Sequence, residues 1–497
     1  TATGGKAAFS TATDTIAVGT TSQIVNPDGS ISLGAGFGGE SGSYLGNSVS
    51  SAGDVNNDGY DDLIVSAPYT ATNAGAAYVL YGNAAGAGVN LTSGTIDASN
   101  GFRITGGASS TTGFSVSGVG DINGDGYADV IVGSPGGTSS AYVLYGNSTN
   151  AGVNLSSGTI ASSDGFKLTG LSGNYLGMSV SGVGDVNGDG LADLIVGAGI
   201  GSTAGTYTGS AYVVFGSTAN TNLTLTGALA SSQGFMIVGG SYSYLGYSIS
   251  GAGDVNGDGF ADLIVGAPEG LTAQNTGTAY VIYGNGTGAT INLSSGAITS
   301  DVGFKITGQS GTFLGSTVSS AGDVNGDGLA DVIVGGGSSN PADAYVIYGR
   351  ATGADVNLGD GTIAVNIGFK ITDPVGSNLG RGLSVSSAGD VNGDGLSDLI
   401  VQANTSTTTD GAAFVVYGKT STTGFNLSGG TIASSDGFKL VTPNDTTDKF
   451  GWAVSNAGDI NGDGLSDLII GAATANSNSG AYHIILGGTQ TVTSAVN

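Results

Sequence analysis

The chain has 497 residues with 37 acidic and 10 basic side chains, a net charge of −27 and no cysteine. The acidic excess disfavours nucleic acid as a partner, because phosphate binding requires clustered lysine and arginine, and it disfavours adsorption to anionic membranes. The lack of cysteine excludes disulfides and thiolate catalysis. No apolar stretch approaches the roughly 18 residues of a membrane-spanning helix, so we expect no direct membrane insertion.

The chain begins with a segment, residues 1–30, that is rich in Ser, Thr, Gly and Ala. It is predicted to be a lead-in or linker with short β-like pieces at Thr15–Val18 and Gln23–Val25. Residues 31–490 are repetitive, and residues 491–497 are expected to form a C-terminal tail.

One acidic motif, D-x-N-x-D-G-x-x-D, organises the repetitive part of the chain. It occurs seven times, each time before an apolar run, at residues 54–62, 121–129, 185–193, 254–262, 323–331, 390–398 and 459–467. A regular period of about 68 residues indicates a repeat architecture and one closed array rather than several unrelated domains.

Each repeat contains four strand-like pieces. In the third copy they are residues 176–183 before the motif, 194–198 after it, 210–216, and 234–239. Turns of Gly, Asn, Asp and Ser separate them, as in an antiparallel meander, and no stretch has a sustained helical period. Seven units of this kind predict an all-β, seven-bladed β-propeller of four-stranded antiparallel blades.

The N-terminal piece Ile31–Phe37 looks like the fourth strand of the other units, such as Gly101-Phe102, yet it precedes the first acidic motif. The last unit has no such piece after Tyr482–Leu486. We therefore expect the N-terminal strand to join the last blade and close the ring, which would cover two sheet edges at once.

The acidic motif is predicted to bind Ca²⁺, a hard cation that takes roughly six to eight oxygen ligands from carboxylates, amides, carbonyls and water. Glycine at position 6 supplies the positive φ that lets the chain wrap the ion. Side chains at positions 1, 3, 5 and 9 and the backbone carbonyl at position 7 would be the ligands of about seven structural ions. In chain order the predicted ligands are Asp54, Asn56, Asp58, Tyr60, Asp62; Asp121, Asn123, Asp125, Tyr127, Asp129; Asp185, Asn187, Asp189, Leu191, Asp193; Asp254, Asn256, Asp258, Phe260, Asp262; Asp323, Asn325, Asp327, Leu329, Asp331; Asp390, Asn392, Asp394, Leu396, Asp398; and Asp459, Asn461, Asp463, Leu465, Asp467.

Other interpretations of the motif are less consistent with the sequence. An EF-hand would place Glu at position 12, where this chain has Val65 or Val132 inside a β-type run. The loop also resembles the paired calcium loops of dockerins, but those stand closer together, and the glycine-rich signature of RTX repeats is absent. A plain Asp/Asn/Gly turn without an ion would not require seven copies with every Asp, Asn and Gly position filled.

The residues around the loops carry a family resemblance. Tyr44-Leu-Gly, Gly53-Asp54 and the run ending Ser66-Ala-Pro68 around the first loop have counterparts in the other units. The pattern resembles the FG-GAP repeat of the integrin α-subunit propeller and is especially similar to FG-GAP repeats of large bacterial surface proteins. Several units lack the proline, and no inserted domain interrupts any unit, so integrin partner specificity does not transfer.

The resemblance implies that the calcium loops lie on one face and that ligands dock on the opposite face. The opposite-face loops would be Tyr69–Asn73, Thr206–Thr208, Ser241–Tyr244, Glu269–Thr276 and Asn444–Lys449. Their composition differs between units, which suits a binding surface on a repetitive scaffold, although solvated loops without a partner would look the same.

These observations favour an extracellular calcium-binding recognition or adhesion module, a monomeric part of a larger cell-surface or secreted protein that binds a protein or glycan. A lectin-like propeller and a structural surface-layer component are the alternatives. The lectin alternative requires repeated aromatic pockets, but Tyr44, Tyr175, Tyr244 and Phe313 stand beside Leu-Gly, where we expect core packing. An enzyme is not expected, because the single histidine, His483, lies in an apolar strand and most aspartates belong to the loops.

Overall fold

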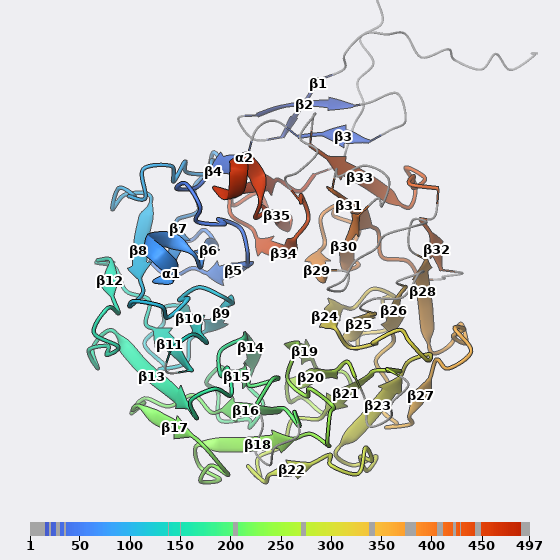
Figure 1. The fold of residues 1–497 in the computed structure, drawn as a ribbon. Helices are drawn as coiled ribbons and strands as arrows, with labels where there is room; N and C mark the ends of the chain where they lie inside the picture. The colour runs from blue at the N-terminus through green and yellow to red at the C-terminus, as the bar shows by residue number, and fades with distance from the viewer. Residues whose placement is uncertain are drawn as a thin grey trace, which may run out of the picture.

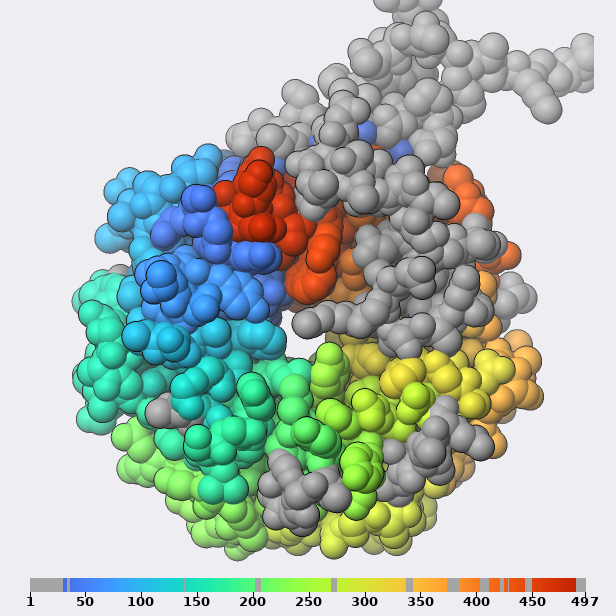
Figure 2. Space-filling view, in the orientation of Figure 1, coloured from blue at the N-terminus to red at the C-terminus, as the bar shows by residue number. Residues whose placement is uncertain are grey.

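The computed structural model is a seven-bladed β-propeller (Figure 1), which confirms the predicted fold class. It describes residues 15–18, 21–25, 30–33, 36–137, 139–149, 151–201, 207–269, 275–336, 343–372, 384–404, 411–420, 424–427, 429–442 and 449–488. Blades follow one another around a ring with an opening near its centre (Figure 2). The predicted tail at 491–497 and most of the predicted lead-in lie outside the described residues.

The first four blades each contain five strands, which run in the following order from the inner edge outwards. Blade one contains β5 (Val49–Gly53), β6 (Asp62–Ala67), β7 (Ala76–Leu80), β8 (Gly101–Thr105) and β12 (Val153–Asn154). Blade two contains β9 (Val116–Gly120), β10 (Asp129–Ser134), β11 (Ser140–Leu144), β13 (Gly165–Gly170) and β17 (Leu223–Leu225). Blade three contains β14 (Ser179–Gly184), β15 (Asp193–Gly197), β16 (Ser210–Val214), β18 (Gly234–Val238) and β22 (Ile291–Asn292). Blade four contains β19 (Ile249–Gly253), β20 (Asp262–Ala267), β21 (Thr278–Ile282), β23 (Gly303–Thr307) and β27 (Val356–Asn357).

The last three blades contain five, seven and four strands. Blade five contains β24 (Thr317–Gly322), β25 (Asp331–Gly335), β26 (Ala344–Ile347), β28 (Gly368–Thr372) and β32 (Phe425–Asn426). Blade six contains β29 (Val385–Gly389), β30 (Asp398–Asn404), β31 (Gly411–Val416), β33 (Gly437–Val441), β3 (Ile31–Ser32), β2 (Thr21–Val25) and β1 (Thr15–Val18). Blade seven contains β34 (Ala453–Gly458), β35 (Asp467–Ala472), β36 (Ala481–Ile485) and β4 (Phe37–Gly38).

The described helices are two four-residue turns, α1 (Thr70–Asn73) and α2 (Ala475–Asn478), which join the second and third strands of blades one and seven. Both lie on the face turned towards the viewer in Figure 1. Within the described residues, no helix has the length and apolar character needed to span a bilayer.

A fifth, parallel strand is the main departure from the predicted four-stranded blade. Strand β12 belongs to the connection between β11 and β13 of blade two, yet Val153 pairs with Ile104 on the outer strand of blade one. Each unit thus latches onto the outer edge of the blade before it. The sequence did not reveal these strands because two or three residues are too few to form a recognisable alternating pattern.

The same arrangement closes the ring. Ile31 pairs with Leu440 of β33 in blade six, so β3 is the latch, while Phe37 pairs with Tyr482 of β36 and completes blade seven. Ring closure by the N-terminal strand is therefore confirmed, but the predicted single outer strand is divided between two blades. A latch onto blade seven is also present, because Leu91 donates its N–H to the carbonyl of Gly38 at 2.9 Å.

The register at the closure explains the single histidine. Pairing with the second strand makes His483 the counterpart of Tyr78 in blade one. Tyr78 stands opposite Arg103, whereas the pairing of Phe37 with Tyr482 brings His483 to Gly36. The Gly36-Phe37 piece is therefore shifted by two residues from the alignment of Gly101-Phe102 in blade one. A Cβ on Gly36 would lie 2.6 Å from Nε2 of His483, so the imidazole occupies space that the glycine leaves free. The ring also meets Phe450 edge-on, with centroids 5.2 Å apart. His483 is a buried packing residue, as its apolar neighbours predict.

The hydrophobic core lies between neighbouring blades. A representative cluster joins Ile64 and Phe102 of blade one to Val130 and Leu144 of blade two. Because each such cluster needs two blades, no blade buries its apolar faces alone, and the closed ring leaves none of them without a neighbour.

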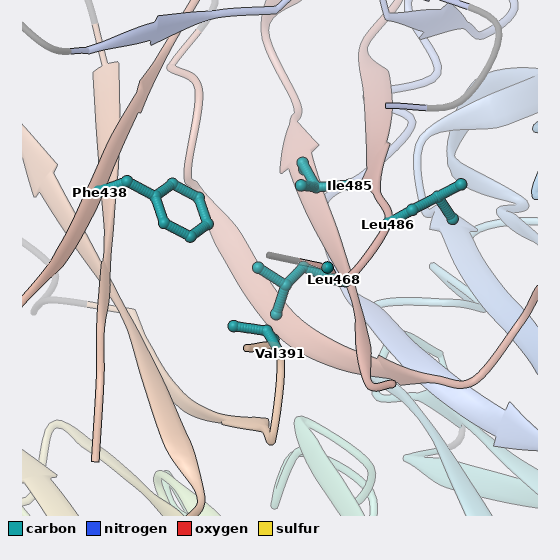
Figure 3. Close-up of a pocket in the computed structure, with 7 residues that line it drawn as sticks. Val391, Phe438, Leu468, Ile485 and Leu486 are labelled. Carbon is teal, nitrogen blue, oxygen red and sulfur yellow. The ribbon is translucent and has the colours of Figure 1, made fainter. Parts of the chain in front are cut away.

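The interface between blades six and seven differs from the others in its connection. Val391, Phe438, Leu468 and Ile485 line a small apolar pocket there (Figure 3). At other interfaces the long connection between latch and outer strand carries an isoleucine or leucine, such as Ile160 or Leu229, that packs onto the cluster. Strand β3 ends at Ser32 and β4 begins at Phe37, so the chain between them is too short to form such a connection.

Burial of His483 makes the closure sensitive to acid. Burial lowers the pKa of His483 to about 4, against about 6.5 in an unfolded chain. Between these values the unfolded chain takes up a proton that the folded protein does not, so stability falls as the pH falls. From pH 7 to pH 5 we expect this residue alone to remove about 2 kcal/mol of unfolding free energy.

The measurement is urea unfolding of the wild type and of His483→Phe and His483→Gln at both pH values. Neither variant titrates in this range, so both should lose less stability on acidification than the wild type, whatever their stability at pH 7. Parallel losses in all three proteins would show that His483 does not control this step.

Candidate functional site

The seven acidic loops connect the first and second strands of their blades, and all seven are among the described residues. The residue before each loop is a glycine with positive φ, such as Gly120 at 73°. The glycine at position 6 also has positive φ, such as Gly126 at 90°. A Cβ on Gly126 would meet no atom within 4 Å, so backbone conformation and not space accounts for glycine at position 6. Glycines at fixed positions in the sequence therefore determine the loop conformation.

The carboxylate at position 1 is the centre of each turn. In the second loop, Oδ1 of Asp121 accepts N–H bonds from Gly124 at 2.6 Å and Asp125 at 3.1 Å, and Oδ2 accepts one from Gly126 at 2.8 Å. Oδ1 of Asn123 accepts the N–H of Asp125 at 2.8 Å. These side chains point into the loop and gather oxygen atoms on its inner side. The pattern recurs in the other copies.

The aspartate at position 9 is fully buried in every copy. In the third loop, Oδ2 of Asp193 accepts the N–H of Val186 at 2.9 Å, and Oδ1 accepts the N–H of Gly216 at 2.8 Å. Val186 belongs to the loop, whereas Gly216 follows the third strand of the blade. This carboxylate therefore ties the loop to the far end of the sheet.

This structural role of position 9 was missed in the sequence, as was its glycine partner. The available signal was a glycine shortly after each third strand. The N–H donors to the position-9 carboxylates are Gly82, Gly146, Gly216, Gly284, Gly349, Gly418 and Gly487.

Burial raises the pKa of the position-9 aspartates, to about 8 for Asp129 and about 7 for the other six. The two backbone N–H groups lower the pKa, and the carboxylates at positions 5 and 1 raise it further. Ion pairs between described side chains join Arg103 to Glu40, and Lys305, Lys370 and Lys419 to aspartates outside the loops. None of them brings a cation to a loop carboxylate.

The loop residues fit Ca²⁺ by their chemistry, since they offer only hard oxygen donors. The two oxygens of a carboxylate have about four lone-pair sites, so an oxygen that accepts one N–H can still take another partner. In the described part of the chain, however, no group of three or more His, Cys, Asp or Glu side chains is placed so that it could hold a metal ion. Hydrogen bonds within each loop connect the predicted ligands at positions 1, 3 and 5, but their carboxylates do not form a ready-made metal site, and calcium binding by them stays a prediction.

Neighbouring loops contact one another around the whole ring. The N–H at position 8 of each loop donates to the carbonyl at position 1 of the loop before it, for example Ala128 to Asp54 at 3.1 Å. In six of these pairs the position-7 side chain covers the position-4 glycine of the preceding loop, as Leu191 does at Gly124. At the closure the N–H of Asp61 donates to the carbonyl of Asp459, whose own N–H donates to the Asp61 carboxylate at 2.9 Å.

The predicted opposite-face loops are only partly described. Tyr69–Asn73 forms α1 and its preceding residue, and Ser241–Tyr244 is described throughout. Thr206, residues 270–274 and residues 444–448 lie outside the described residues.

The expectation that the recurring aromatics pack in the core is wrong for Tyr175, which is 46% exposed, and only partly met by Tyr44, Tyr244 and Phe313, which are half-buried. The leucine that follows each of them is the core residue.

Substitutions within the third loop should separate its two kinds of carboxylate. Asp193→Ala would leave the buried N–H groups of Val186 and Gly216 without acceptors, at about 1–3 kcal/mol each. Asp189→Ala removes an exposed carboxylate that accepts the N–H of Leu191 and the Asn187 amide, so we expect a loss below about 1 kcal/mol.

Urea unfolding with excess chelator tests this difference without any contribution from a metal ion. Equal losses for Asp193→Ala and Asp189→Ala would contradict the anchoring role of position 9.

Comparison with known proteins gives a consistent answer. The FG-GAP repeat model matches residues 45–80, 112–152, 176–214, 245–282 and 450–485, which lie in blades one to four and seven. Integrin alpha-4 of Xenopus laevis is 29% identical over 238 residues, covering 47% of this chain and 20% of the relative. Integrin alpha-3 of Cricetulus griseus is 34% identical over 161 residues, covering 32% and 14%.

A third relative carries a different name. Phosphatidylinositol-glycan-specific phospholipase D of Bos taurus is 36% identical over 160 residues, covering 30% of this chain and 18% of the relative. The chain spans about a fifth or less of the length of these relatives. Repeats, blades and relatives agree, and the chain is an FG-GAP, integrin-α-like β-propeller.

Proposed function

We propose that this propeller is an extracellular calcium-binding recognition or adhesion module. About seven structural Ca²⁺ ions would occupy the acidic loops, and a partner on a cell or matrix surface would bind to the opposite face. The side-chain oxygens at positions 1, 3, 5 and 9 and the carbonyl at position 7 would hold each ion.

The concentration of negative charge carries the calcium proposal. Each loop places at least three carboxylates within nine residues, one of them fully buried, and no ion pair between described side chains reaches them. Like charges at this spacing destabilise one another. A bound Ca²⁺ supplies the missing positive charge, and seven ions would add 14 charges to a net charge of −27. Extracellular modules function with Kd values of roughly 10⁻⁴–10⁻³ M, because calcium outside cells is plentiful.

The similarity to integrin α chains supports a role in recognition. Loops on the opposite face vary between blades, while the acidic loops repeat one sequence, and variable loops on a rigid scaffold suit ligand binding. Because the chain spans only a small part of its relatives, we propose that it acts as one module of a larger protein.

Catalysis is not part of the proposal, although one relative is named as a phospholipase D. That similarity covers 18% of the relative. His483 is buried against Phe450 and Gly36, so it cannot contact a substrate without unfolding the closure. The loop aspartates are assigned to the ions.

Thermal unfolding with and without excess chelator, with bound calcium counted in the same sample, tests the proposal. We expect about seven ions and a large fall in Tm on their removal, since a ligand at 100 times its Kd stabilises by about 2.7 kcal/mol per site. Asp189→Ala should lower the ion count by one. Few bound ions and an unchanged Tm would mean that the loops are ordinary turns.

A further inference from the structure

Three tyrosines gather on the opposite face at the junction of blades three and four. Tyr207 lies between β15 and β16, while Tyr242 and Tyr244 lie between β18 and β19. The rings of Tyr207 and Tyr244 are stacked, with centroids 5.5 Å apart and planes 8° from parallel. Tyr207 is 47% exposed and Tyr242 is 54% exposed. Large hydrophobic side chains this exposed are few among the described residues, and two of them belong to this cluster, which we call the tyrosine patch.

Tyr242 stands where the fold otherwise has a small residue. Three positions before the buried leucine of the corresponding loops, the chain has Gly42, Gly173 and Gly311, with φ of 73°, 83° and 82°. Tyr242 keeps this left-handed conformation, with φ of 59°. A bulky residue at positive φ costs of the order of 1–3 kcal/mol, and strain of this kind concentrates at functional sites. Packing does not repay the cost, because the Tyr242 side chain is mostly exposed.

The backbone under the patch is firmly held. Leu245 is fully buried, and its N–H donates to the carbonyl of Thr208 at 3.4 Å. The hydroxyl of Ser243 donates to the same carbonyl at 2.7 Å, and the N–H of Tyr244 donates to the carbonyl of Tyr207 at 3.4 Å. The two loops are thus joined on both sides of the stacked rings. A surface ordered before binding loses little conformational entropy when a ligand arrives.

We propose that the tyrosine patch binds a neutral glycan by stacking its aromatic faces against the apolar C–H face of a pyranose ring. This rests on the proposed function of the opposite face and names the chemistry of its partner. Tyrosine suits the task because it offers a large apolar ring with few rotatable bonds and a hydroxyl that can hydrogen-bond at the rim.

The size and surroundings of the patch favour a glycan over other ligands. A stable protein interface buries about 800 Å² on each side around an apolar centre, whereas three rings beside Ser241 and Thr208 form a surface of the size of one or two sugar units. Burial raises the pKa of Tyr244 and the carboxylate of Glu269 raises it further, so a negative charge lies within electrostatic range of the rings. That carboxylate and the net charge of −27 repel anionic glycans.

The decisive variant is Tyr242→Gly, which installs the residue that three other blades already have at this position. A Cβ on Gly42, Gly173 or Gly311 would meet no atom within 4 Å, so the fold does not need a side chain there. We expect Tyr242→Gly to fold with a Tm close to that of the wild type. Tyr207→Ala is the second patch variant, and Tyr175→Ala is the matched control, an exposed tyrosine outside the patch with φ of 57°.

Binding is measured in saturating calcium against immobilised cellohexaose, maltohexaose, β-1,4-mannohexaose and chitohexaose, with a heparin hexasaccharide and hexalysine as charged probes. We expect the wild type and Tyr175→Ala to bind at least one neutral hexasaccharide, and Tyr242→Gly and Tyr207→Ala to bind it at least tenfold more weakly. Bound calcium is counted for every variant and should not change.

Three results would overturn the glycan assignment: binding to none of the neutral hexasaccharides, equal binding by Tyr242→Gly and the wild type, or patch-dependent binding of hexalysine or heparin in their place. Equal binding by Tyr242→Gly would leave a recognition role for another part of the face. If the wild type bound a neutral hexasaccharide through the patch but held no calcium, the glycan assignment would stand and the calcium part of the proposed function would be wrong.

Discussion

The buried carboxylate at position 9 of each loop is the contact on which the blades depend. It holds two backbone N–H groups that belong to distant parts of a blade, one inside the loop and one beyond the third strand. Without it, the turn between the first two strands would be joined to the rest of the sheet only by the strands themselves. Burying a charged group is costly unless hydrogen bonds compensate, which explains why both oxygens are bonded and why the surrounding acidic residues make a cation favourable.

The loops also form a structure of their own. Each loop donates a hydrogen bond to the preceding loop and covers its position-4 backbone, and the series returns to its start at Asp61 and Asp459. The ring is therefore closed at two levels: by the strands β3 and β4 at the outer edge and by backbone contacts between loops at one face. Each loop is held both by its own blade and by hydrogen bonds to the loops before and after it. A substitution that disturbs one loop should therefore disturb the conformation of those two loops first.

Most of the fold follows from the repeat, because seven copies of one motif place seven equivalent turns, and apolar runs at fixed distances from them define the strands. What the sequence could not provide depends on pairing between units. The two-residue latch at Val153–Asn154 has no pattern of its own. The placement of His483 against Gly36 depends on a shift by two residues at the closure, where the chain ends do not repeat the other units. The loop ligands were named from spacing alone, but the double hydrogen bond at Asp193 required the position of Gly216.

The loops on the two faces of the ring differ in how closely their sequences repeat from blade to blade. On the acidic face every loop repeats the same residue types at the same positions, as expected where a backbone conformation and a charge pattern must be preserved. On the opposite face four of the described loops keep a buried leucine, while blades two and seven have Thr112 and Phe450 there. The residues around this position differ between blades, and Tyr242 takes a backbone conformation that Gly42, Gly173 and Gly311 adopt more easily. Positive φ alone does not distinguish Tyr242, because Tyr44, Tyr175, Tyr244 and Phe313 share it at another position of the same loops. At the position of Tyr242, however, the tyrosine departs from the repeat without gaining burial, and contact with a ligand explains this better than folding does. The departure from the repeat, more than the repeat itself, therefore marks where this propeller meets its partner.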